Sequence, residues 1–471
     1  MRMIWIVTIT SILAGEGAKA DADALKVGRA SAEITPAVGT PLNGPQRPGV
    51  SARTTAEAHD PLRVKALVLE EGGNRVALVV CDVTSIPLKL IEEARRLVGE
   101  ATEIDPLSVM IGATHSHTAP QLRPRFLGNA DDESRRKALA YIDALPRKMA
   151  EAVRRAEADL RPARASAALG REDSISFNRR FYMKDGGVMV NPYKGDDAKL
   201  DRILRPTGPI DPEVGVVAFA AEGAGGEPLA TMVNFAIHLD TMGGERPSAD
   251  FPFMLDRVLG AVHGPEMLTV FAMGAAGNVN HYDLLDPARP RRTKGPRESS
   301  RIGAILAAEA LRMHPRLAPL RGSPLRTARE VVRVDYHPEK ARKLLEKIGQ
   351  SPRHFDGEVE VMNEGGKISF DAEVQAIALG DELAWVGLPG EMFVELGLAL
   401  KDASPFRYTM IHTLANGSIG YVPNLRAYPE GAYEAAATRC APGSGERLIE
   451  AATRLLIELK AEGRHLGEAS P

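Results

Sequence analysis

The sequence predicts an α/β fold of the mixed α+β kind, in which buried central strands are flanked by helices. Short apolar runs alternate with amphipathic helical stretches through most of the chain. Apolar residues make up 44% of the 471 residues and charged residues 26%, a composition that is ordinary for a globular protein and argues against disorder. No linker or internal repeat divides the chain clearly, so we predict one large domain over residues 21–471.

The first twenty residues resemble a targeting segment. Arg2 provides a positive charge, Met3 to Ile12 form a short apolar run, and Ala18-Lys19-Ala20 offers a cleavage site with small residues. The apolar run is too short to cross a bilayer, which takes about 20 residues. We therefore expect a signal peptide over residues 1–20, cleaved after Ala20, and a secreted or periplasmic protein without a stable membrane span. The alternative for this segment is a frayed N-terminal helix.

The first elements of the mature chain form a strand pair followed by a helix. Val64 to Leu69 and Arg75 to Cys81 predict a hairpin joined through Gly72-Gly73-Asn74. Apolar spacing then predicts a helix over Leu88 to Val98, and a short apolar run predicts a buried strand over Ser108 to Ile111.

A long helical stretch runs from Glu133 to Ala158 and contains Pro146. Because proline removes a helical hydrogen bond and clashes with the preceding turn, we predict an interruption there. The remaining elements follow from the same patterns. Strands are predicted over Val214 to Ala220, Ala230 to Phe235, Leu268 to Met273 and Ala384 to Leu388, and helices over Ser299 to Met313, Pro338 to Ile348 and Glu446 to Lys460.

Charge and cysteine content narrow the possible partners. The formal net charge is −3, so no polyanion-binding surface is indicated and nucleic acid is not an expected partner. Cys81 and Cys440 are the two cysteines of the chain, and the sequence does not decide whether they pair. Two cysteines cannot build a structural zinc site on their own, so any metal site must rely on histidines and carboxylates.

His115 and His117 follow directly after the apolar strand that ends near Ile111. A loop at the end of a strand is where α/β proteins place much of their chemistry. In extended backbone, residues two apart point to the same side, so both imidazoles can face one pocket, with neighbouring Thr and Ser hydroxyls fixing the ring tautomers. A His-x-His pair alone is weak support for a metal site, and a structural role is the alternative.

His238 and Glu391 are the other candidate ligands. His238 also follows a buried strand, and Glu391 lies where a strand turns into a helix, a position at which a carboxylate is also a good helix cap. Together His115, His238 and Glu391 would form a set of two histidines and one carboxylate with an open position for water. Catalytic zinc is commonly bound in this way.

Five short segments occur in a fixed order along the chain. They are Gly28 to Pro36 (G-R-A-S-A-E-I-T-P), Thr114 to Pro120 (T-H-S-H-T-A-P), Asn234 to His238 (N-F-A-I-H), Gly390-Glu391, and Gly420-Tyr421-Val422 with Tyr433 twelve residues after Tyr421. In type and order they resemble segments of the neutral and alkaline ceramidase family. The chain is similar to stand-alone bacterial relatives of the N-terminal catalytic domain, and we expect no C-terminal immunoglobulin-like domain.

The resemblance implies a ceramidase-like catalytic domain and assigns roles to individual residues. It implies zinc as cofactor, with His115, His238, Glu391 and Tyr421 as its ligands. It implies that His117 and Tyr433 line the site as proton-transfer or oxyanion groups, and that Arg179, in Phe177-Asn178-Arg179-Arg180, faces the substrate.

One departure from the family bears on mechanism. The family's G-D-V-S-P segment appears here as Gly277-Asn278-Val279-Asn280-His281, so Asn280 stands at a serine once assigned a nucleophilic role. Asparagine cannot be a covalent nucleophile, although Asn280 could hold a substrate carbonyl or hydroxyl. We therefore expect a zinc-dependent hydrolase that cleaves the amide bond of a small-molecule or lipid-like N-acyl substrate with metal-activated water. The alternatives are a zinc-dependent esterase or lactonase acting on a small extracellular metabolite, and a catalytically inactive binding protein.

Overall fold

The computed structural model describes residues 24–44, 50–193, 197–223, 225–286, 293–349, 351–355 and 357–468. The expected signal peptide lies outside the described residues. In the described part of the chain, no helix is both long enough and apolar enough to cross a membrane.

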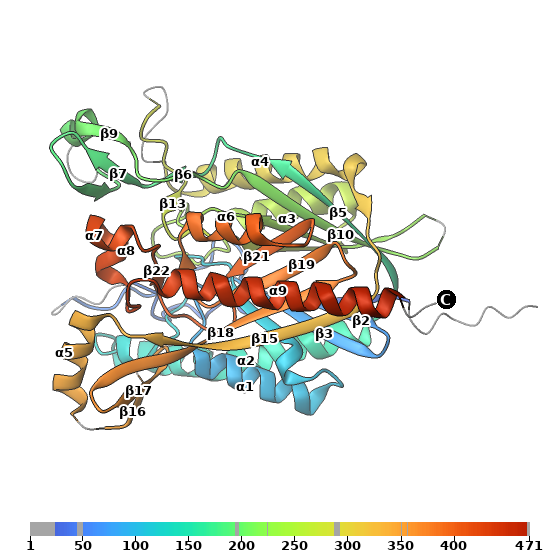
Figure 1. Ribbon diagram of the computed structural model, residues 1–471, viewed down its shortest axis with the longest axis horizontal. Coiled ribbons are helices and arrows are strands. Elements are labelled where there is room, and N and C mark those ends of the chain that lie inside the picture. Colours follow the sequence, from blue (N-terminus) through green and yellow to red (C-terminus); the bar gives the residue numbers. More distant parts are fainter. Residues whose placement is uncertain are drawn as a thin grey trace, which may run out of the picture.

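The larger of two main sheets has nine strands, in the order β12-β11-β10-β5-β1-β2-β3-β4, with β14 paired to β5. Figure 1 labels β2, β3, β5 and β10 of this sheet. β3 and β4 are parallel, as are β11 and β12. Although β4 and β12 stand at opposite ends of this order, β12 contacts both β3 and β4. The sheet is therefore coiled so that its two edges approach each other. Its strands are β1 (Lys26–Glu33), β2 (Arg63–Glu71), β3 (Asn74–Cys81), β4 (Val109–Ala113), β5 (Arg161–Arg171), β10 (Glu213–Ala221), β11 (Pro228–Phe235), β12 (Leu268–Met273) and β14 (Ala318–Pro319).

The second sheet has six strands, in the order β16-β17-β18-β19-β21, with β15 paired to β18. Its strands are β15 (Leu325–Asp335), β16 (Arg353–Phe355), β17 (Glu360–Glu364), β18 (Lys367–Leu379), β19 (Leu383–Leu388) and β21 (Tyr408–Thr413). Short strands form three small sheets beside the two main ones. They are β6 (Phe177–Asn178) with β13 (Val279–Asn280), β20 (Glu391–Met392) with β22 (Tyr421–Val422), and β7 (Arg180–Met183) with β8 (Val188–Val190) and β9 (Ile203–Pro206).

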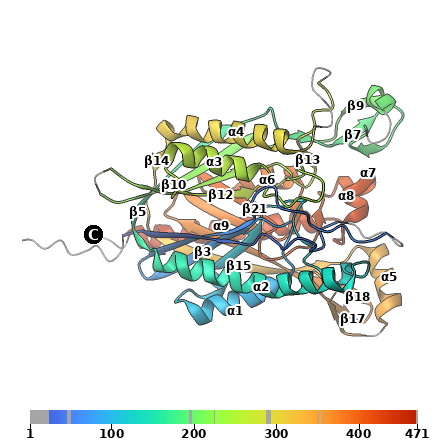
Figure 2. The ribbon, with the colours of Figure 1, turned by 180° about the vertical axis from the view of Figure 1, so that it is seen from behind.

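Helices cover the outer faces of the two main sheets, which gives four layers (Figure 2). The helices α1, α2, α3 and α4 share a buried apolar cluster with the nine-stranded sheet. A second cluster lies between the six-stranded sheet and the helices α6 and α9, and a third joins the two sheets face to face. The helices are α1 (Leu88–Ala101), α2 (Asp132–Ala158), α3 (Phe251–His263), α4 (Pro296–Met313), α5 (Pro338–Ile348), α6 (Val394–Ala403), α7 (Ala427–Glu430), α8 (Ala432–Ala437) and α9 (Ser444–Glu468).

The mixed α/β architecture expected from the sequence is confirmed, and so is the β2–β3 hairpin. One expectation is wrong, because α2 runs without interruption through Pro146. The helix buries Leu145, Met149 and Val153 against the apolar cluster beneath it. Burial of each large apolar side chain stabilises the fold by about 2 kcal/mol, which offsets the loss of the hydrogen bond that Pro146 cannot make. Cys81 and Cys440 are both buried and unpaired.

Gly112 of β4 packs against His412 of β21, so that the two main sheets meet directly behind the loop after β4. A Cβ atom at Gly112 would lie 2.3 Å from Cε1 of His412. We expect Gly112→Ala to lower the free energy of unfolding by about 2 kcal/mol, because overpacking forces neighbours to shift. Chemical denaturation measures this. Gly260→Ala in α3, whose new Cβ would meet nothing closer than 3.9 Å, is the control and should match or exceed wild-type stability. Equal stability of both variants would contradict the tight packing.

Candidate metal centre

The site begins at the end of β4, where the chain turns sharply at His115. His115 has φ of +76°, a left-handed conformation that is unfavourable for any residue with a Cβ. Its backbone N–H donates to the carbonyl of Val83 at 3.0 Å, and the N–H of His117 donates to that of Leu239 at 3.2 Å. The two imidazoles do share one pocket, as expected, but this strained turn rather than extended backbone brings them together.

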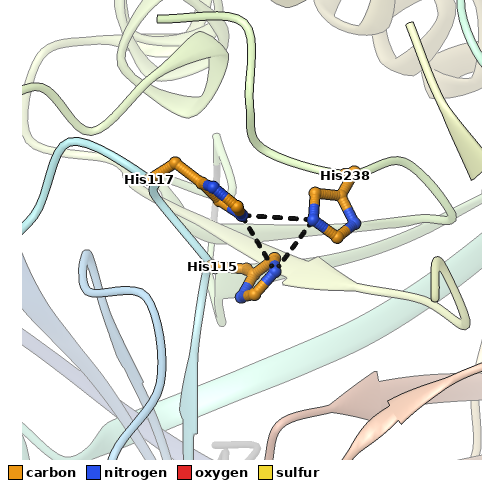
Figure 3. Close-up of side chains that lie close together, drawn as sticks. All are labelled: His115, His117 and His238. Atoms are coloured by element: carbon orange, nitrogen blue, oxygen red, sulfur yellow. Dashed lines mark hydrogen bonds between the residues drawn. The ribbon is translucent and has the colours of Figure 1, made fainter. Parts of the chain in front are cut away.

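Three imidazoles converge on one point, and they come from two loops of the coiled sheet. Figure 3 shows His115, His117 and His238 with their rings turned toward one another. The Nε2 atom of His115 lies 3.1 Å from that of His238 and 3.2 Å from that of His117, and the remaining Nε2–Nε2 distance is 3.1 Å. Three nitrogens bound tetrahedrally to one zinc ion would be about 3.3 Å apart, since Zn–N distances are about 2.0–2.1 Å. The cluster therefore has the dimensions of a metal site.

Hydrogen bonds fix the tautomers of two of these rings. Nδ1 of His115 donates to the carbonyl of Thr84 at 2.6 Å, and Nδ1 of His238 donates to the carbonyl of Ala276 at 3.2 Å. Burial and the neighbouring His115 ring lower the pKa of His238 well below its usual value, so this ring is neutral. Neutral His238, whose Nδ1 proton is donated to Ala276, directs the lone pair of its Nε2 atom at the His115 ring. Metal-ligating histidines typically donate their other N–H to a carbonyl in this way.

The hydroxyls beside the histidines do not orient the rings, contrary to the expectation from the sequence. The Ser116 and Thr118 hydroxyls donate to the carbonyl of Ser248 at 2.6 Å and 3.3 Å, and the Thr114 hydroxyl has no partner among the described residues. These bonds tie the histidine loop to the neighbouring backbone, while backbone carbonyls hold the rings.

Glu391 faces the same point from β20. Its Oε2 atom lies 3.3 Å from Nε2 of His115 and 3.9 Å from Nε2 of His238, and accepts no hydrogen bond from the described residues. Burial raises the pKa of this carboxyl, but His115, Arg179 and the Tyr421 hydroxyl outweigh it and hold the pKa below its usual value. The alternative role as a helix cap is excluded, because Phe393 is the residue at the N-cap of α6. A buried, ionised carboxylate with an unsatisfied oxygen fits a metal ligand.

Tyr421 lies next to Glu391 because β20 and β22 pair in parallel at these two residues. The Arg179 guanidinium donates to the Tyr421 hydroxyl at 3.2 Å, to the carbonyl of Gly277 at 2.6 Å and to Glu434 at 2.8 Å. Glu434 is fully buried and also pairs with Arg180 at 2.9 Å. Arg179 is thus placed behind Tyr421, with its guanidinium turned to the phenolic oxygen.

His117 differs from the other two histidines. Its side chain is 33% exposed, and its Nδ1 atom lies 3.9 Å from the Asp240 carboxylate, beyond hydrogen-bond distance. Asp240 in turn accepts a hydrogen bond from Lys294 at 2.5 Å. No hydrogen bond from the described residues fixes the tautomer of His117, and burial and the neighbouring His115 ring lower the pKa of His117 to about 4.

The two remaining predicted residues lie at different distances from the cluster. The Tyr433 ring packs edge-on against that of Tyr421, with centroids 5.5 Å apart, and lines the cavity above the histidines. Asn280 is buried, donates to the Asn191 side chain at 3.0 Å and accepts from the N–H of Tyr282 at 3.1 Å. Its amide is therefore occupied by contacts within the protein.

The cluster opens into a cavity of about 660 Å³. His115, His117, Glu391, Tyr421 and Tyr433 line it, together with polar residues that the sequence did not single out. Asp240 follows His238 by two residues, so its place just after a strand end could have marked it as a candidate site residue. The others share no motif and reach the cavity from separate loops: Asn43, Arg53, Ser85, Gln121, Arg123, Lys294 and Glu358.

Comparison with solved structures identifies the architecture. Neither a protein-family model nor a curated protein matches the chain in sequence. The neutral ceramidase from Pseudomonas aeruginosa superposes with a TM-score of 0.70 at 19% identity, over 94% of this chain and 75% of the ceramidase. A ceramidase complexed with C2 superposes with a TM-score of 0.69 at 18% identity, over 93% of this chain and 76% of that one. The chain therefore has a neutral ceramidase-like fold.

Proposed function

We propose that this protein is a zinc-dependent hydrolase that cleaves the amide bond of an N-acyl compound by direct attack of water. One observation carries the proposal: the Nε2 atoms of His115 and His238, whose Nδ1 atoms are each held by a backbone carbonyl, converge with an ionised Glu391 oxygen that accepts no hydrogen bond from the described residues. These three groups are suited to hold a cation at the point where they meet. The ceramidase fold supports the choice of an amide bond.

We assign the zinc ligands to His115, His238, Glu391 and Tyr421. When bound, Zn²⁺ would polarise the scissile carbonyl and lower the pKa of a coordinated water from 15.7 to about 7. Arg179 positions Tyr421, and its positive charge favours the phenolate form of a ligand whose pKa is otherwise raised by burial and by Glu391.

Proton transfer belongs to His117 in this proposal. Its half-exposed ring faces the cavity, and the Asp240 carboxylate beside Nδ1 stabilises the imidazolium that forms when Nε2 takes a proton from the attacking water. The same proton then passes to the departing amine. Tyr433, on the cavity wall, supplies a hydroxyl that donates to the developing oxyanion. Asn280 has no covalent role, and its contacts with Asn191 and Tyr282 hold the wall behind the site.

A substrate panel with and without metal tests the bond type. The purified protein is assayed on matched pairs of amides, esters and lactones, before and after dialysis against a chelator. We expect amide hydrolysis that disappears on chelation and returns with added zinc. Hydrolysis restricted to esters or lactones would make the protein a zinc esterase or lactonase. A zinc-loaded protein that binds amides and cleaves none would make it a binding protein of this fold.

A further inference from the structure

Most of the residues that line the cavity above the histidines are polar or charged. Apart from the two tyrosines, only Phe126 and Met242 contribute large apolar side chains to its lining in the described part of the chain. The remaining wall consists of charged and amide groups, small polar residues and four glycines. Burial of one CH₂ group of a ligand favours binding by about 0.8 kcal/mol, but only where the group packs against apolar side chains. A long acyl chain would therefore meet few large apolar side chains here.

Three cations stand around the cavity, and two of them are neutralised by carboxylates. Arg123 donates to Glu358 at 2.5 Å, and Lys294 donates to Asp240 at 2.5 Å. Both also hold these carboxylates in place, so neither charge is available to a ligand without breaking an internal ion pair.

Arg53 is the third cation, and it has no carboxylate partner among the described residues. Its guanidinium reaches only the carbonyls of Gly244 and Asn43, each at 3.5 Å, the outer limit of a hydrogen bond. Its side chain is exposed and lines the same cavity as His117 and Lys294. A planar guanidinium with free N–H groups binds a carboxylate through two parallel hydrogen bonds.

We propose that the substrate is a small hydrophilic N-acyl compound with a short acyl chain and a carboxylate on its amine part, and that Arg53 binds this carboxylate. N-acyl amino acids have this chemistry. The inference rests on the proposed amide hydrolysis and names the substrate class of the same site. Arg53 is a specificity-determining residue, and the metal cluster performs the chemistry.

The test compares N-acetyl amino acids with their uncharged carboxamide analogues in wild type and Arg53→Gln. We expect wild type to prefer the carboxylates. We expect Arg53→Gln to raise KM for the carboxylate about five- to tenfold more than for the analogue, with kcat nearly equal, because an exposed charge-assisted contact is worth about 1 kcal/mol. Arg316→Gln is the matched control, because Arg316 is exposed and far from the cavity. Lys294 lies just before the first residue of α4 and Arg316 just after its last, and the helix between them is roughly 27 Å long.

An acyl-length series completes the test, with acetyl, butyryl, octanoyl and palmitoyl amides of one amino acid. We expect kcat/KM to peak at the short chains. Two results would overturn the inference while leaving amide hydrolysis intact: kcat/KM that rises steadily to palmitoyl, or equal KM changes for the charged and uncharged substrates in Arg53→Gln. If wild type with bound zinc cleaves none of these amides at any chain length, the proposed function fails instead, and the inference falls with it.

Discussion

His238→Ala is expected to remove bound zinc and activity together. The variant deletes one of the two imidazoles whose tautomer is fixed by a backbone carbonyl and whose lone pair faces the other ligands. We expect zinc content to fall from about one ion per chain to near zero. We expect kcat/KM to fall at least about a thousandfold, since metal polarisation supplies several kcal/mol and each 1.4 kcal/mol is a factor of ten. Elemental analysis and steady-state kinetics on the same preparation measure both.

His314→Ala is the matched control, because His314 is exposed and stacks on His263 away from the cluster. It should retain wild-type zinc and activity. Thermal unfolding of His238→Ala without added metal distinguishes ligand loss from misfolding. A folded His238→Ala protein with full zinc content would remove His238 from the ligand set.

His117→Ala is expected to keep the metal and lose most of the activity. His117 differs from His115 and His238 because no carbonyl fixes its tautomer and because its ring is partly exposed to the cavity. A positioned general base contributes about 10²–10⁴-fold to a hydrolysis rate, so we expect kcat to fall by that factor while zinc stays near one per chain.

Loss of zinc in His117→Ala would contradict this division of roles. All three Nε2 atoms lie within 3.2 Å of one another, so the distances alone also accommodate a site of three imidazoles. His117→Gln provides a second variant, because it keeps a polar side chain of similar length. Full activity in either variant would exclude His117 as the base.

Much of the candidate site could be predicted from the sequence because its residues follow strand ends. His115 and His117 come directly after β4, and His238 comes directly after β11. Glu391 was indicated by its place where a strand turns into a helix, and Tyr421 could be added only through the family resemblance. The sequence contained no sign that the β4 and β12 edges of one sheet would meet, since this depends on the coiling of the whole sheet.

Other features depend on contacts that no local pattern encodes. The carbonyls that orient His115 and His238 belong to Thr84 and Ala276, 31 and 38 residues away in the chain. Any residue has a carbonyl, so composition could not single these out. The continuous helix through Pro146 likewise follows from tertiary burial, which overrides the local preference of proline. The polar cavity wall comes from separate loops, which is why the substrate class had to be inferred from the structure.

Metal content of the purified wild-type protein tests the central claim most directly. The protein is treated with chelator, supplied with excess zinc, freed of unbound metal and analysed by elemental analysis beside His238→Ala. We expect about one zinc per chain in wild type and none in the variant. No stoichiometric transition metal in wild type, even after zinc is supplied, would contradict a metallohydrolase and leave the fold with a binding role.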